Sequence, residues 1–223
     1  MGLAMLPACW AATRVLIDSI FRSVGLVDGF AIESIALLGG MGLFALLWSM
    51  MPHPVKTYVL GHELTHVIWG LLFFARPSKL KVGENGGSVK LTRTNFLITL
   101  APYFFPFYTF LVITAALIVR YFCNPLPCLW LWMLGIGFTW AFHFLFTLQT
   151  LTVKQPDVVQ YGRIFSWTFI YIANVALVLI WLCCTTRLTF VDLGGFIIRR
   201  GMHAYASLVS IFVYSIRWIA DMF

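Results

Sequence analysis

The sequence predicts an all-α polytopic membrane protein with about five to six transmembrane helices and a small β-hairpin between the second and third spans. Hydrophobic residues make up 61% of the chain and charged residues only 10%, far from the average of soluble proteins. Several apolar stretches reach the roughly 20 residues that a helix needs to cross a bilayer. One polar stretch, residues 76–93, separates the second of them from the third.

We divide the chain into an N-terminal interfacial or membrane segment (residues 1–30), a membrane-embedded core (31–184) and a membrane-associated C-terminal tail (185–223). In the first segment Arg14 and Asp18 interrupt the apolar residues, which favours an amphipathic helix in the membrane interface and leaves a further span as the alternative. The tail breaks at two adjacent glycines and ends in an apolar helix that either spans the membrane or lies flat on it.

The core holds five expected spans. They cover residues 31–51, 55–74, 95–122, 129–151 and 164–184. In the first span Gly39, Gly40 and Gly42 allow close approach of another helix. In the third span Pro102 and Pro106 should kink the first half of the helix.

Between the second and third spans, residues 79–82 and 88–91 alternate polar and apolar side chains on either side of Gly83-Glu84-Asn85-Gly86-Gly87. This pattern predicts a β-hairpin with a glycine-rich turn. If the sheet edge lies beside an active site, it could bind an unwound substrate strand by β-addition; a plain connector is the alternative.

A polar stripe runs along the fourth span, because Thr139, His143, Thr147 and Thr150 recur at helical spacing. Polar side chains are costly in hydrocarbon, so the stripe should face the interior of the helical bundle. With Asn174 of the fifth span, it is reasonable lining for a cavity that admits water.

The second span contains the motif His62-Glu63-Leu64-Thr65-His66. Residues four apart lie on one face of a helix, so His62 and His66 can share one metal ion. Glu63 is offset from that face, so it is expected to act as the general base and not as a ligand. Zinc lowers the pKa of its bound water and polarises a carbonyl, so the pattern predicts a zinc-dependent hydrolase at membrane depth.

A catalytic zinc ion usually takes three protein ligands, so a third ligand is needed. The chain has only eight acidic residues, and Asp157 follows the polar stripe at a membrane boundary. We therefore predict Asp157 as the third ligand, with His143 as the alternative. His143 could instead stabilise an oxyanion or position the substrate, and Asn174 could contact the substrate.

These residues resemble the site-2 protease family of intramembrane zinc metalloproteases. The likeness covers residues 55–165 and rests on Gly61 followed by the histidine motif, the glycine-rich hairpin, Leu100-Ala101-Pro102, and a late acidic residue, Asp157. It implies a helical core that holds zinc through two histidines and one aspartate, and cleavage of membrane-spanning protein segments. Many members carry the aspartate in an Asn-Pro…Asp-Gly pattern, whereas this chain has Gln-Pro-Asp-Val.

We therefore expect an intramembrane zinc metalloprotease that hydrolyses peptide bonds of membrane-spanning protein substrates by a zinc-activated water. The alternatives are a catalytically inactive membrane scaffold of the same fold and a transporter-like bundle; an intact Glu63 argues against the scaffold, and the lack of repeated halves against the transporter. The chain has a net charge of +7, and its Lys and Arg residues are scattered between the apolar spans. Contacts with anionic lipid explain this distribution better than binding to nucleic acid does. The default location is the bacterial inner membrane.

Overall fold

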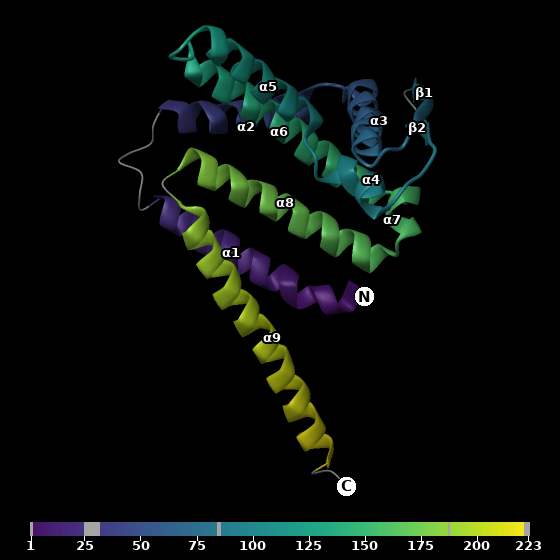
Figure 1. The fold of residues 1–223 in the computed structure, drawn as a ribbon, viewed down its shortest axis with the longest axis vertical. Coiled ribbons are helices and arrows are strands. Elements are labelled where there is room, and N and C mark those ends of the chain that lie inside the picture. The colour runs from purple at the N-terminus through teal and green to yellow at the C-terminus, as the bar shows by residue number, and fades with distance from the viewer. Residues whose placement is uncertain (1, 25–31, 84–85, 187, 221–223) are drawn as a thin grey trace. The chain divides into compact units, whose positions relative to one another are not determined.

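The protein, seen here in a computed structural model, is mostly helical with one two-stranded antiparallel hairpin (Figure 1), as the sequence predicts. The structure describes residues 2–24, 32–83, 86–186 and 188–220. The predicted region boundary at residue 30 and the turn residues Glu84 and Asn85 lie outside these ranges. The chain forms two compact units, one of Met1–Asp28 with Tyr161–Phe223 and one of Gly29–Gln160.

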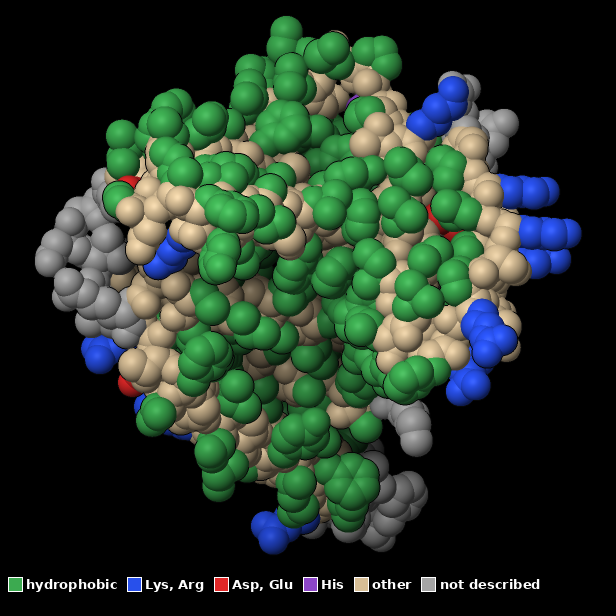
Figure 2. All heavy atoms as spheres, turned by 45° about the horizontal axis from the view of Figure 1, so that its top comes forward, with side chains coloured by type: hydrophobic (Ala, Val, Ile, Leu, Met, Phe, Trp, Pro, Cys, Tyr) green, Lys and Arg blue, Asp and Glu red, His purple; other side chains and the backbone are tan. Residues whose placement is uncertain are grey.

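Three of the described helices are long and apolar enough to cross a membrane, namely α2 (Ile32–Met50), α6 (Leu129–Thr152) and α8 (Arg163–Thr185). The segment Phe96–Tyr103 together with α5 (Phe107–Phe122) makes a fourth if this bent pair counts as one span. Hydrophobic side chains cover most of the face drawn in Figure 2. Length and composition thus support three to four of the five to six predicted spans.

The helix that carries the histidine motif, α3 (Val55–Leu72), is not among these candidates. Its hydropathy is lowered by Lys56 and by the three ionisable residues of the motif. Its outward face is nevertheless apolar, because Leu60, Ile68 and Leu71 are exposed while Glu63 and Thr65 are buried. The polar residues of the motif therefore point inward, whereas Lys56 and Thr57 in the first turn are exposed. The average hydropathy of the helix does not show which of its faces is apolar.

The third predicted span is broken, as its two prolines predict. The helix α4 (Phe96–Leu100) continues into the short 3₁₀ helix η2 (Ala101–Tyr103) and then bends by 81° before α5 begins. A proline has no backbone N–H to donate, so Pro106 is tolerated just ahead of the first turn of α5 and not in a continuous helix. The break brings the carbonyl groups of α4 next to α3.

The predicted hairpin is confirmed: β1 (Pro77–Gly83) pairs antiparallel with β2 (Gly86–Leu91), and both strands pack against α3. The approach is closest at Gly87. A Cβ atom there would lie 2.7 Å from Cγ of Glu63 and 2.7 Å from Cγ1 of Val59. Since such distances are shorter than van der Waals contact, only glycine allows the strand to lie this near the helix.

Within the second unit α2 packs along α6, and two glycines allow the contact. A Cβ atom on Gly40 would clash with the carbonyl oxygen of Leu134, and one on Gly137 would clash with the carbonyl oxygen of Leu37. Gly39 and Gly42 have open space instead, so only the second of the three predicted glycines takes part in this packing.

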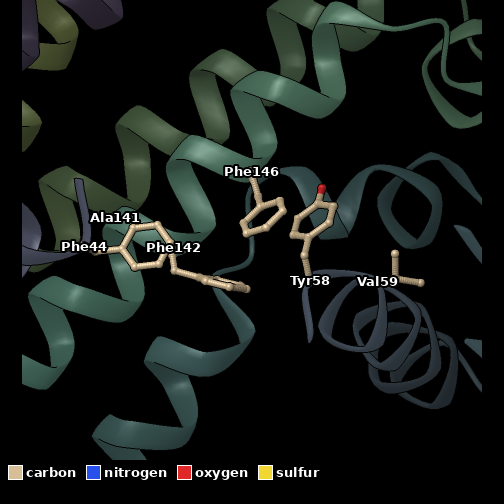
Figure 3. Close-up of a cluster of buried hydrophobic side chains, with 6 residues drawn as sticks. All are labelled: Phe44, Tyr58, Val59, Ala141, Phe142 and Phe146. Carbon is tan, nitrogen blue, oxygen red and sulfur yellow. The ribbon is translucent and has the colours of Figure 1, made fainter. Parts of the chain in front are cut away.

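A cluster of buried hydrophobic side chains joins α3 to α2 and α6 (Figure 3). Its members are Phe44, Tyr58, Val59, Ala141, Phe142 and Phe146. The rings of Tyr58 and Phe146 stack with centroids 4.7 Å apart and an interplanar angle of 6°. Because Tyr58 lies one turn before His62, this stack fixes the rotation of α3 about its axis and hence the direction of the motif.

The first unit consists of η1 (Gly2–Met5), α1 (Leu6–Val24), α8 and α9 (Phe190–Ala220). Val15 of α1 packs with Val175 and Leu179 of α8 and with Leu193 of α9. Arg200 also donates two hydrogen bonds to Asp18, from Nε (2.6 Å) and Nη2 (2.8 Å). An apolar cluster and one bidentate ion pair therefore hold α1 and α9 together.

Candidate metal centre

The two histidines of the motif face the same side of α3. The ring centroids of His62 and His66 are 4.9 Å apart, and each side chain is 12% exposed. This is the arrangement that the spacing of four residues predicts for one helical face.

Asp157 lies opposite the two histidines, in the short helix α7 (Pro156–Gln160). Its Oδ2 atom is 3.5 Å from Nε2 of His62 and 3.5 Å from Nε2 of His66. Tyr103 also donates a hydrogen bond from its hydroxyl to Oδ2 (3.4 Å).

These three residues could hold a metal ion. One ligand atom from each of His62, His66 and Asp157 lies within 4.8 Å of the other two. Two imidazole nitrogens and a carboxylate oxygen are a donor set that suits zinc. The geometry thus confirms the prediction that two histidines and one aspartate form a group that could hold a metal ion.

The orientation of His66 also fits a metal ligand. Its Nδ1 atom donates a hydrogen bond to the carbonyl oxygen of Ile98 in α4 (2.9 Å). With the proton held at Nδ1, the lone pair of Nε2 is directed toward Asp157. Histidine ligands are commonly fixed in this way by a hydrogen bond at the nitrogen that does not bind the metal.

Glu63 lies beside the cluster and is 6% exposed. It packs against Gly87 of β2, and both residues line a cavity of about 870 Å³ together with His62, His66 and Asp157. Other lining residues come from α6, among them Gln149 and Thr150. The carboxyl group of Glu63 is thus placed at the cavity that contains the candidate ligand atoms, without being one of them.

His143 is placed differently from the other candidates. It is buried in α6 and lines a second, small cavity with His62, but it does not line the large one. Among the residues that the structure describes, it is not part of the metal-ligand group. The polar stripe does face inward, because His143 and Thr147 are buried and Thr150 lines the large cavity.

Asn174 lies on α8, in the first unit. Its side-chain amide donates to the carbonyl oxygen of Ile170 one turn earlier (2.9 Å). Its contact with a substrate stays a prediction.

Two contributors escaped the sequence analysis: the carbonyl group of Ile98 and the hydroxyl group of Tyr103. A backbone carbonyl carries no residue signal, so Ile98 could not have been found. Tyr103 had a weak signal, because a tyrosine between two prolines in an apolar segment marks a polar group at a helix break.

Comparison of the chain with family models, with curated proteins and with solved structures gives no match.

Proposed function

We propose that this chain is an intramembrane zinc metalloprotease of the site-2 protease type, which hydrolyses peptide bonds of membrane-spanning protein substrates. One observation carries the proposal: Oδ2 of Asp157 lies 3.5 Å from Nε2 of both His62 and His66. These residues come from two helices far apart in the sequence, and they form the ligand set of a hydrolytic zinc site.

His62, His66 and Asp157 would hold the ion. Bound there, zinc would supply Lewis acidity, which activates water as a nucleophile and polarises a carbonyl group. The protein keeps the ligand atoms in place through the hydrogen bond from His66 to Ile98 and the one from Tyr103 to Asp157. Such supporting hydrogen bonds tune both affinity and orientation.

Glu63 serves as the general base and then as the general acid. It takes a proton from the attacking water and delivers it to the leaving amine of the substrate. Its position at the wall of the large cavity suits this role, because the candidate ligands His62, His66 and Asp157 line the same cavity. The backbone of Gly87 lies close against the side chain of Glu63.

The membrane setting supports a membrane-protein substrate. The helix α3 turns Glu63 and Thr65 inward and Leu60, Ile68 and Leu71 outward, so we infer that it is an additional span beside the apolar helices α2 and α6. A peptide bond that reaches Glu63 would then come from a segment within or beside the bilayer. The bacterial inner membrane is the default location.

The test uses purified wild-type protein in liposomes with a reporter whose single transmembrane helix is flanked by two tags. Wild type should cleave reporters of this kind, and Glu63→Gln should reduce cleavage by about 10²–10⁴-fold while it keeps its zinc. Zinc in both proteins but equal cleavage would assign the cleavage to a contaminant. Zinc in both without cleavage of a wide panel of such reporters would favour the inactive scaffold.

A further inference from the structure

A second, small cavity borders His62. It is lined by His62 and Thr65 of α3, by Phe142 and His143 of α6, and by residues around the break between η2 and α5. Its volume is about 20 Å³. A cavity of roughly 10–15 Å³ is enough for one water molecule if polar groups face it.

Two imidazoles on this wall have nitrogen atoms whose hydrogen bonds are not satisfied. Nδ1 of His62 and Nε2 of His143 are buried and have no hydrogen-bond partner among the described residues. A buried polar atom left unpaired destabilises the fold, so such atoms are normally bonded to protein or to water. Both histidines are conspicuous in this respect because they line one cavity.

Two other polar groups of the wall are already satisfied. The hydroxyl of Thr65 donates to the carbonyl oxygen of Gly61 (2.7 Å), and the hydroxyl of Tyr108 donates to the carbonyl oxygen of Thr57 (2.6 Å). The hydroxyl of Tyr58, which also lines the cavity, has no hydrogen-bond partner among the described residues either. A water molecule in the cavity would therefore find its partners in the two histidines, with the hydroxyl of Tyr58 available for a third hydrogen bond.

We propose that His143 is a positioning residue, which holds a buried water molecule that accepts a hydrogen bond from Nδ1–H of His62 and donates one to Nε2 of His143. The arrangement fixes the proton of His62 at Nδ1 and leaves the lone pair of Nε2 directed toward Asp157. It does for His62 what the carbonyl oxygen of Ile98 does for His66. This inference rests on the proposed zinc site and assigns to His143 a role other than ligand or substrate contact.

The experiment measures zinc affinity by chelator competition, and the absorption spectrum of the Co²⁺-substituted protein, for wild type and three variants. His143→Phe keeps a flat ring of similar size and removes the hydrogen-bonding nitrogen. His143→Gln keeps a hydrogen-bonding group. His203→Phe makes the same chemical change on α9, in the other unit, and serves as the matched control.

We expect His143→Phe to weaken zinc binding by about 10–100-fold and to alter the Co²⁺ spectrum, as loss of a supporting hydrogen bond does. His143→Gln should restore most of the affinity, and His203→Phe should bind as wild type does. A role in packing alone would give the opposite order, because phenylalanine fills the site better than glutamine.

Equal zinc affinity in His143→Phe and wild type would overturn the inference and leave the proposed function intact. Wild type without zinc affinity would overturn both. If the variants do not fold, an experimental structure of wild type decides: water within about 2.7–3.2 Å of both nitrogens supports the inference, and a cavity without that water overturns it.

Discussion

Gly87 and Glu63 are in such close contact that a Cβ atom on Gly87 would lie 2.7 Å from Cγ and 2.9 Å from Oε1 of Glu63. The hairpin thus forms the wall against which the proposed general base rests. Glycine at this position is required by the nearness of Glu63.

Gly87→Ala should therefore impair catalysis more than metal binding. The added methyl group must displace either β2 or the carboxyl group of Glu63, and a misplacement of about 1 Å can cost on the order of 10²-fold in rate. The measurement is reporter cleavage together with zinc content. Gly83→Ala is the matched control, because a Cβ atom there meets only the carbonyl oxygen of Gly86 at an ordinary 3.4 Å. Equal loss of cleavage in both variants would contradict the proposed contact.

Gly40→Ala should destabilise the second unit. Its Cβ atom would meet the carbonyl group of Leu134, and backbone atoms cannot move aside by a change of rotamer. Overpacking of this kind costs about 1–3 kcal/mol. Thermal unfolding in detergent should therefore occur at a lower temperature than in wild type. Gly39→Ala, one residue away with open space, should unfold at or above the wild-type temperature; the reverse order would refute the close packing of α2 on α6.

The ion pair between Asp18 and Arg200 should make stability depend on pH. The hydrogen bond from Arg200 lowers the pKa of Asp18 in the folded protein. A carboxyl group with a lowered pKa stabilises the fold above its unfolded pKa, and this contribution is lost as the pH falls through the folded value. Asp18→Asn should therefore unfold at a lower temperature than wild type at pH 7, and the difference should shrink below about pH 4.

The control for this prediction is Glu33→Gln, which removes one carboxylate from α2 in the other unit. It tests whether removal of any carboxylate gives the effect expected for Asp18→Asn. If the difference in unfolding temperature between Asp18→Asn and wild type stayed constant from pH 7 to pH 3, the ion pair would be excluded as its cause.

Much of the fold could be predicted because its signals are local. The alternating residues of the hairpin and the two prolines of the third span act within a few residues, and both features appear in the structure. The number of spans was harder to predict. The hydropathy of α3 is averaged around the helix, so inward polar residues conceal an apolar outer face.

In the candidate site, too, local patterns could be predicted and long-range packing could not. The spacing of His62 and His66 places both rings on one face, and the scarcity of acidic residues singled out Asp157, which the structure brings next to both. The helical period placed His143 on the inward face of α6 but could not tell which of two cavities it lines. That choice depends on how α3 and α6 pack, which is a long-range property of the fold.

In the proposed function, His62, His66 and Asp157 together bind zinc. The most direct test is to measure the zinc content of purified wild type and of Asp157→Ala. Asp192→Asn, at a partly buried carboxylate in the first turn of α9, is the control. We predict about one zinc per chain in wild type and in the control, and a clear loss in Asp157→Ala. Folded wild type without zinc, or Asp157→Ala with undiminished zinc, would contradict the account.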